Sequence, residues 1–195
     1  MLSIAFSLFF ISAVLASNEQ CCVHKEFSAI MAEPGLIAKG TNQFTRLAED
    51  FEAKLLATHT FNFVPGSSST PLHRVVQDFN QSKQYTIYGN TCTVKKIEYE
   101  MQGPCIPDDA VVLGSNIMGF QSNSIDITSY SWSFGNQTAT LVMIFNDDCV
   151  PLVQAIGRTL NGAPVDTTYV FTQYSDTIED RSIFDIPANC PSPSS

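Results

Sequence analysis

Aromatic and polar residues alternate most clearly in the middle of the chain, where serines separate Tyr130, Trp132 and Phe134. Residues two positions apart lie on the same face of a β-strand. The pattern therefore predicts a strand with three aromatic rings on one face and hydroxyl groups on the other.

A second apolar run follows this strand after two residues that suit a tight turn. Gly135-Asn136 tolerates the positive φ angles of a hairpin turn. Residues 138–145 are nearly all apolar or β-branched, as in a strand that is covered on both faces. A helix is the alternative for this run, but the run is short and rich in β-forming residues. The region 125–151 is therefore predicted to be a β-hairpin.

Short runs of β-branched and aromatic residues recur along the rest of the chain, separated by turn signals about every ten residues. This spacing is typical of an antiparallel sandwich or an open barrel, so the predicted fold class is mainly β. In 97–101, Ile97, Tyr99 and Met101 alternate with charged residues. The other predicted strands are 36–45, 58–64, 73–79, 83–88, 152–159 and 167–174.

Two segments are ambiguous on their residues alone. In 46–58, Leu47, Phe51 and Leu55 fall at helical spacing among good helix formers, whereas a pair of strands broken near Asp50 is the competing interpretation. Residues 110–120 show no clear period and are predicted to be irregular, with a possible helical turn.

The first residues resemble a secretory signal peptide. Leu2–Leu15 is apolar, and the small residues that follow suit cleavage between Ala16 and Ser17. The run is shorter than a membrane span needs, and no later segment is long and apolar enough to cross a bilayer. We therefore expect a signal peptide over 1–16, a single domain over 17–195, and secretion to the extracellular space.

Composition excludes some classes of partner. The chain has 195 residues and a net charge of −9. Such a charge argues against binding to nucleic acid or to anionic membranes at neutral pH.

Six cysteines follow the predicted signal peptide. An even number in a secreted chain predicts three disulfides. The adjacent Cys21 and Cys22 cannot easily bond to each other, so they are expected to reach two different partners. Two sequons, at Asn80 and Asn136, are candidates for N-glycosylation.

No motif of nucleophilic or phosphate chemistry is present. The chain has neither a Gly-x-Ser-x-Gly elbow nor a glycine-rich phosphate loop, and its three histidines lie far apart. We therefore do not predict an enzyme. The paired acids Asp108, Asp109, Asp147 and Asp148 are candidate Ca²⁺ ligands, with solvated surface carboxylates as the alternative.

Five aromatic residues could line a ligand cavity. Cavities that hold apolar ligands are common inside barrels and between sheets, but the same rings could simply fill a core. The candidates are Tyr130, Trp132, Phe134, Tyr169 and Phe171.

Several short motifs, taken in order, resemble the ependymin family. The closest is 178–190, which ends in Phe184-x-x-Pro187-x-x-Cys190. The others are 77–87 followed by 92–95, Pro107 to Ala110, the strand with Trp132, and Cys149-Val150-Pro151. The resemblance covers about residues 36–190.

This resemblance implies a secreted, disulfide-bonded glycoprotein without known catalysis, which is often a homodimer. It implies two stacked antiparallel sheets, similar to bacterial periplasmic lipoprotein carriers, with a hydrophobic pocket. Calcium binding, lipid binding and cell–matrix adhesion are associated with the family. It also implies strands around Asp50, and we predict strands there in place of a helix.

The family pattern further implies a Cys92–Cys190 bridge and a bridge from Cys21 or Cys22 to Cys149. This chain departs from the pattern in having Cys105 and the doubled N-terminal cysteine. We expect Cys105 to take the remaining N-terminal partner.

The leading hypothesis is a secreted protein that binds an apolar or lipid ligand between its sheets, with possible calcium binding. Acid pH would ease its approach to anionic lipid heads by protonating carboxylates. The alternative is a structural adhesion glycoprotein of the extracellular matrix, with calcium-dependent contacts and no ligand pocket.

Overall fold

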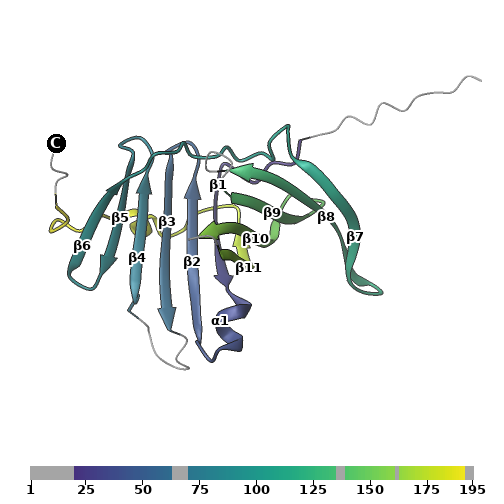
Figure 1. Cartoon of the computed structure of the whole chain (residues 1–195), viewed down its shortest axis with the longest axis horizontal. Helices are drawn as coiled ribbons and strands as arrows, with labels where there is room; N and C mark the ends of the chain where they lie inside the picture. The colour runs from purple at the N-terminus through teal and green to yellow at the C-terminus, as the bar shows by residue number, and fades with distance from the viewer. Residues whose placement is uncertain (1–19, 63–69, 135–138, 161–162, 192–195) are drawn as a thin grey trace, which may run out of the picture.

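The structure is a computed structural model that describes residues 20–62, 70–134, 139–160 and 163–191. Within these residues eleven strands form one antiparallel sheet in the order β6-β5-β4-β3-β2-β1-β11-β10-β9-β8-β7 (Figure 1). The mainly β class is confirmed. The strands are β1 Glu26–Ala32, β2 Gln43–Asp50, β3 Leu55–Asn62, β4 His73–Asp78, β5 Lys83–Tyr88, β6 Thr91–Lys96, β7 Val111–Phe120, β8 Asn123–Phe134, β9 Ala139–Asn146, β10 Pro151–Leu160 and β11 Ala163–Ser175.

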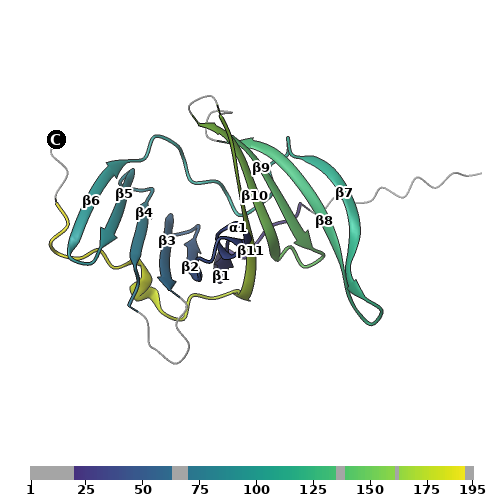
Figure 2. The ribbon, with the colours of Figure 1, turned by 60° about the horizontal axis from the view of Figure 1, so that its bottom comes forward.

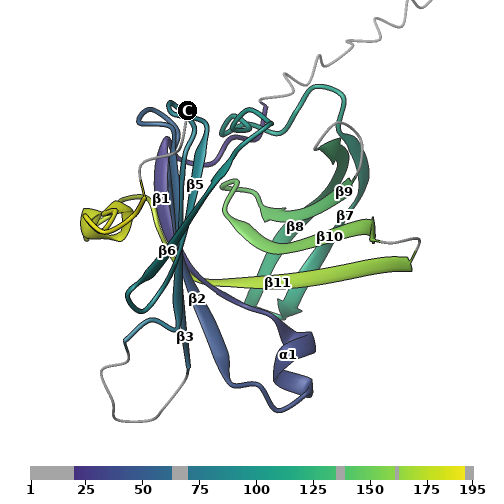
Figure 3. The ribbon, with the colours of Figure 1, turned by 60° about the vertical axis from the view of Figure 1, so that its left-hand side comes forward.

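The sheet is bent into two halves that face each other, a first half of β1–β6 and a second half of β7–β11 (Figures 2 and 3). The predicted stacked sheets are therefore two halves of one continuous antiparallel sheet. Strand β11 joins the halves, because residues 163–170 pair with β10 and residues 170–175 pair with β1. The register of β1 against β11 shifts between Ser28 and Ile30, and Gln173 has φ 50°, which is the geometry of a bulge that sharpens a bend.

The two edge strands of the sheet, β6 and β7, are consecutive in the chain. Residues 97–110, which we call the crossover segment, connect them by running from one edge of the sheet to the other (Figure 1). The prediction of a strand over 97–101 is wrong. The Ile97 N–H donates to Ser82 O at 2.8 Å, which continues the backbone ladder of β5 and β6. Beyond Ile97, the alternating residues have no neighbouring strand to pair with among the described residues.

The ambiguous segment 46–58 forms β2 and β3, so the strand prediction is confirmed. The two strands are joined by a turn over 51–54, in which Lys54 has φ 55° and Asp50 Oδ1 accepts from Ala53 N–H at 2.8 Å. Leu47 and Ala48 are both buried although they point to opposite faces of the sheet. Burial on both faces requires a strand in a double-layered core, and it overrides the helical propensity of the segment.

The central hairpin forms as predicted, because β8 pairs with β9 and Trp132 lies opposite Leu141. The turn residues 135–138 lie outside the described residues. The expectation that the return strand is covered on both faces is wrong, since Leu141 and Met143 are buried while Val142 is only partly buried.

Of two further predictions, the short strand in 36–45 is met only at its end, and the irregular structure of 110–120 is wrong. Residues 36–45 form the end of a short helix, α1 (Pro34–Ala38), and the start of β2. Residues 110–120, predicted to be irregular, contain β7. Nine of the ten β7 residues are exposed, so this strand carries none of the hydrophobic alternation by which a half-buried strand is recognised.

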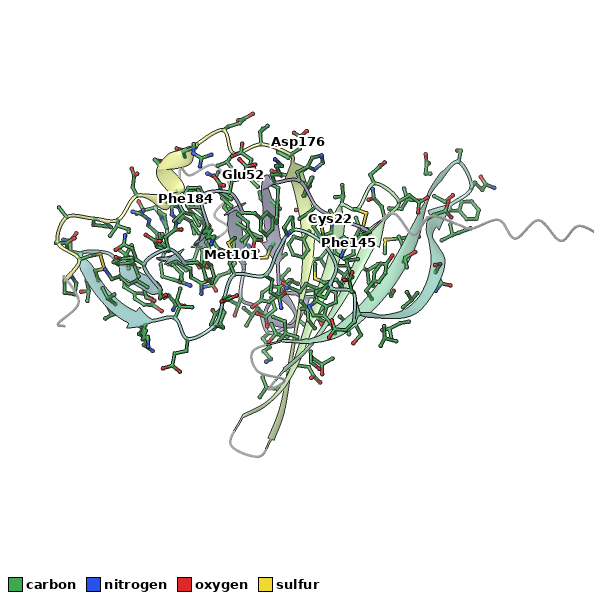
Figure 4. The ribbon with its side chains drawn as sticks, turned by 90° about the horizontal axis from the view of Figure 1, so that it is seen from above. Cys22, Glu52, Met101, Phe145, Asp176 and Phe184 are labelled. Carbon is green, nitrogen blue, oxygen red and sulfur yellow. A yellow bond between two sulfur atoms is a disulfide. The ribbon has the colours of Figure 1, made fainter. Side chains whose placement is uncertain are left out.

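The core has one cluster on each face of the first half. The inner cluster lies between the two halves and includes Phe27, Leu47 and Phe145. The outer cluster lies beneath the C-terminal segment, residues 176–190, and includes Val76 and Phe184. Figure 4 shows Phe184 at the yellow turn of the C-terminal segment, and Met101 closer to the second half than Phe184 is.

Three disulfides connect these layers. The pairs are Cys21–Cys149, Cys22–Cys105 and Cys92–Cys190. Cys21, and not Cys22, therefore takes Cys149. The predicted signal peptide lies outside the described residues, among which no helix is long and apolar enough to cross a membrane.

Candidate functional site

A pocket of about 410 Å³ lies between the two halves of the sheet. We call it the inner pocket. Its walls are mostly apolar and come from both halves and from the crossover segment. The lining includes Val23, Phe27, Met31, Leu47, Glu49, Phe51, Leu56 and Phe79 on the first side, Trp132, Leu141, Met143, Ile156, Tyr169 and Phe171 on the second, and Tyr99 to Cys105 of the crossover segment.

Strand alternation explains why these side chains share the pocket. Leu47, Glu49 and Phe51 are spaced by two along β2 and its following turn, so they point to the same side. Glu49 lies opposite Phe27 on β1 and opposite Leu56 on β3. Its nearest cross-strand neighbours are therefore apolar on both sides.

Glu49 is the most unusual group of the pocket. No hydrogen bond or ion pair joins its carboxyl to any other described residue. The protein surrounds the side chain except where it faces the pocket, and this burial raises the pKa of the Glu49 carboxyl to about 7. The carboxyl thus changes its charge close to neutral pH.

Trp132 supplies a second unpartnered polar group, from the opposite wall. Its indole Nε1 is buried and meets no hydrogen-bond acceptor among the described residues. A buried donor without a partner costs free energy, so most proteins avoid one. Within the described part of the inner pocket, Glu49 is thus an acceptor without a partner and Trp132 a donor without one.

The crossover segment forms the third wall and is anchored at both ends. Gln77 Nε2 donates to Tyr99 Oη at 3.0 Å, and Cys105 is bonded to Cys22. Val23 N–H donates to Pro104 O at 2.9 Å. These contacts hold a non-strand segment across the opening between the halves.

Three of the five aromatic residues predicted for a pocket line it: Trp132, Tyr169 and Phe171. Tyr130 packs against the inner cluster, with its ring centroid 6.1 Å from that of Phe145. The side chain of Phe134 lies outside the described residues. The sequence reasoning missed Glu49, although an acid between the apolar Leu47 and Phe51 was a signal for it.

A second cavity, of about 400 Å³, lies on the outer face beneath the C-terminal segment. It is more polar, with Arg46, His59 and Asp180 among its lining residues. The two cavities have similar volumes, but the walls of the inner pocket are far more apolar. We therefore favour the inner pocket as the site.

In the outer cavity, His59 Nε2 lies 3.0 Å from Arg74 Nε and 3.1 Å from Ile183 O. Arg74 can only donate, so His59 is neutral when it accepts this bond. Burial, followed by the positive charge of Arg74, lowers the pKa of His59. Neither contact is the hydrogen bond between a nucleophile and a base that acyl transfer requires.

Arg181 holds the C-terminal segment against the outer face. It forms ion pairs with Glu26, at 2.6 Å, and with Asp50. Burial opposes ionisation of Asp50, but hydrogen bonds from Ala53 N–H and Arg181 outweigh it and lower the pKa of Asp50.

The candidate calcium ligands remain a prediction. Asp108 Oδ1 accepts from Gln20 Nε2 at 3.1 Å. Across the described ranges, no three His, Cys, Asp or Glu side chains gather in a way that could hold a metal ion. Of the two sequons, Asn80 is exposed and its Nδ2 donates to Ala53 O at 2.7 Å, whereas Asn136 lies outside the described residues.

Comparisons with known proteins agree with this architecture. The family model described as Ependymin matches residues 67–190. Ependymin-related protein 1 of Haliotis asinina is 24% identical over an alignment of 208 positions, gaps included, and the alignment covers 94% of this chain and 96% of that protein. A crystal structure of an uncharacterized conserved protein from Thermus thermophilus has a TM-score of 0.50 at 12% identity, and the match covers 85% of this chain and 87% of that one. At this identity the likeness concerns the fold alone.

Proposed function

Because the chain belongs to the ependymin family, we propose that it is a secreted protein that holds an apolar or lipid ligand in its inner pocket. The three disulfides fit an extracellular protein, since such bonds persist in oxidising compartments.

The observation that carries the proposal is the inner pocket itself. Its volume of about 410 Å³ falls within the range of roughly 300–1,000 Å³ that is usual for small-molecule sites. Apolar area buried by a ligand would contribute about 25 cal/mol per Å². A few polar groups among apolar walls are typical of sites that fix the orientation of a ligand.

Filling the pocket should weaken binding. Leu56 lines the pocket, so Leu56→Trp places a bulky ring where the ligand would lie. We expect the affinity for N-phenylnaphthylamine, an uncharged apolar dye that brightens outside water, to fall at least about tenfold, which corresponds to about 1.4 kcal/mol. Fluorescence titration measures this effect.

Leu72→Trp is the matched control, because Leu72 is exposed and does not line the inner pocket. It adds the same ring and should leave dye binding unchanged. Equal dye binding by both variants would place the dye elsewhere and contradict the proposal.

We also propose that two copies pair through the edge strand β7. The strand has no partner on its outer edge among the described residues and exposes several large apolar side chains. Such an edge is a template for pairing with another strand, and antiparallel pairing with its own copy gives a closed two-fold dimer. The most exposed of these residues are Val111 (61%), Ile117 (67%) and Phe120 (75%).

Ile117→Arg should therefore shift the protein to monomers, because it places two charges in the apolar interface of a two-fold dimer. We expect the dimer dissociation constant, measured by sedimentation equilibrium, to rise at least about tenfold. Ile37→Arg on α1 is the control, since Ile37 is also exposed (52%) but lies away from β7. An unchanged dissociation constant for Ile117→Arg would exclude β7 as the contact.

A further inference from the structure

The inner pocket contains an acid that has no partner among the described residues. Glu49 lies between Phe27 and Leu56 of the neighbouring strands, and no described residue donates a hydrogen bond to its carboxyl. A buried carboxylate without a partner is costly, and it gains free energy from any donor or cation that reaches it.

The described residues that line the pocket carry charge of one sign only. Besides Glu49, its titratable lining residues are Glu100, Tyr99 and Tyr169. Among the described residues that line it, none is Lys, Arg or His. A ligand carboxylate or phosphate inside the pocket would therefore meet negative charge, and none of the described lining residues would supply a compensating cation.

Aromatic rings make the same surroundings favourable for a cation. Phe27 and Phe51 lie on the same side of the sheet as Glu49, and Trp132 and Phe171 line the opposite wall. The faces of such rings attract an ammonium group, most strongly where water is excluded. The apolar remainder of the pocket suits a hydrocarbon chain.

We propose that the ligand of the inner pocket is a long-chain amine, whose ammonium group pairs with the carboxylate of Glu49 while its chain lies against the apolar walls. This inference rests on the proposed function and specifies its ligand class. Much of the desolvation cost of Glu49 is already incurred when the protein folds, so the ligand mainly bears the cost of its own ammonium group.

The binding should depend on pH. The pKa of Glu49 is raised to about 7 by burial, whereas an alkylamine stays protonated to about pH 10. Among the described residues, the other titratable groups that line the pocket are Glu100 and Tyr99 of the crossover segment and Tyr169 of β11. The described lining residues of β1, β3, β4, β8, β9 and β10 do not titrate. Amine affinity should thus rise between about pH 6 and pH 8 as Glu49 ionises.

The experiment compares dodecylamine, dodecanol and dodecanoate, which share one chain, by calorimetric titration of the full secreted protein. Trp132 is the only tryptophan of the chain and gives a second readout through its emission. At about pH 8 we expect the amine to bind at least about tenfold more tightly than the alcohol, and dodecanoate to bind most weakly.

Glu49→Gln should remove the preference for the amine and leave dodecanol binding nearly unchanged. Glu52→Gln is the matched control, because it removes the same charge from an exposed side chain that pairs with Lys25. It also corrects for the general attraction of a cation to a chain of net charge −9.

The outcomes separate the two proposals. Equal binding of the amine and the alcohol, tighter binding of dodecanoate, or an amine preference that survives in Glu49→Gln would overturn the amine proposal while the lipid-binding function stands. Failure of all three compounds to bind would overturn both.

Discussion

Replacing Cys92 and Cys190 together by serine should lower the free energy of unfolding by about 4 kcal/mol. The bridge joins β6 to the end of the C-terminal segment, and both cysteines pack against the outer cluster. Without it the unfolded chain gains conformational freedom that the native state does not share. Urea unfolding followed by circular dichroism measures the loss.

The size of the loop decides this number. The two cysteines lie 98 positions apart, but the adjacent Cys21 and Cys22 link the other two bridges and shorten the path. With those bridges intact, the shortest covalent path between Cys92 and Cys190 runs 13 positions from Cys92 to Cys105 and 41 positions from Cys149 to Cys190. The loop that the bridge closes therefore has roughly 55 residues. The entropy of closing a loop of that length corresponds to about 4 kcal/mol. Removing two bridges together should lower the stability by more than the sum of the two single losses, because each bridge closes a longer loop when the other is absent.

The Cys22→Ser/Cys105→Ser variant provides the comparison. It should lose a similar amount of stability, because its bridge also closes a loop of several tens of residues when the others are present. It also frees the crossover segment, so it should weaken dye binding in the inner pocket, whereas the Cys92→Ser/Cys190→Ser variant should not. Equal dye affinities in the two variants would show that the crossover segment is not a functional wall.

The sequence predicted those elements whose local pattern and tertiary environment agree. The hairpin of β8 and β9 is an example, because the rings of Tyr130 and Trp132 alternate with serines and one face of the strand is covered. Strands β4 and β5 were recognised for a similar reason, since β-branched and aromatic runs flank a polar turn at Asn80.

The failures arose where long-range contacts decide the structure. The residues 97–101 alternate like a strand, but a strand needs a hydrogen-bonding neighbour, and this segment leaves the sheet edge to cross the molecule. Strand β7 was missed for the opposite reason, because it pairs with β8 along one edge while its side chains remain exposed. Similarly, no local signal tells whether two halves are separate sheets or one sheet that bends at β11.

The candidate site was predicted only in part. The aromatic wall, which includes Trp132, could be proposed from the alternation of aromatic and polar residues, because this periodicity is visible in the sequence alone. The role of Glu49 depends on what lies opposite it across the fold, and the bend at β11 determines that environment. The same bend places the Trp132 indole across the pocket from Glu49, so the positions of these two unpartnered groups result from tertiary structure.

Glu49→Gln should raise the free energy of unfolding by about 3 kcal/mol at about pH 8 and change it little near pH 4. Burial raises the pKa of Glu49 from 4.5 to about 7, so the folded state holds a proton that the unfolded state releases between these values. Stability therefore falls as pH rises from about 4.5 to 7, and a neutral glutamine escapes this loss. Urea unfolding of the wild-type protein and of Glu49→Gln across this pH range measures the difference.

The difference between the two proteins is more informative than either pH profile alone. His59 has a pKa below its ordinary value of 6.5, so its unfolded form binds more protons and its contribution to stability rises with pH through that window. Asp50, whose pKa is lowered, acts in the same direction at more acid pH. Both contributions cancel in the comparison, and Glu52→Gln should show no such pH-dependent gain because Glu52 is exposed. A gain in the stability of Glu49→Gln that is constant with pH would mean that water or another partner already solvates the carboxyl of Glu49. The attraction between this carboxylate and an ammonium ligand would then be much weaker than the burial of Glu49 implies.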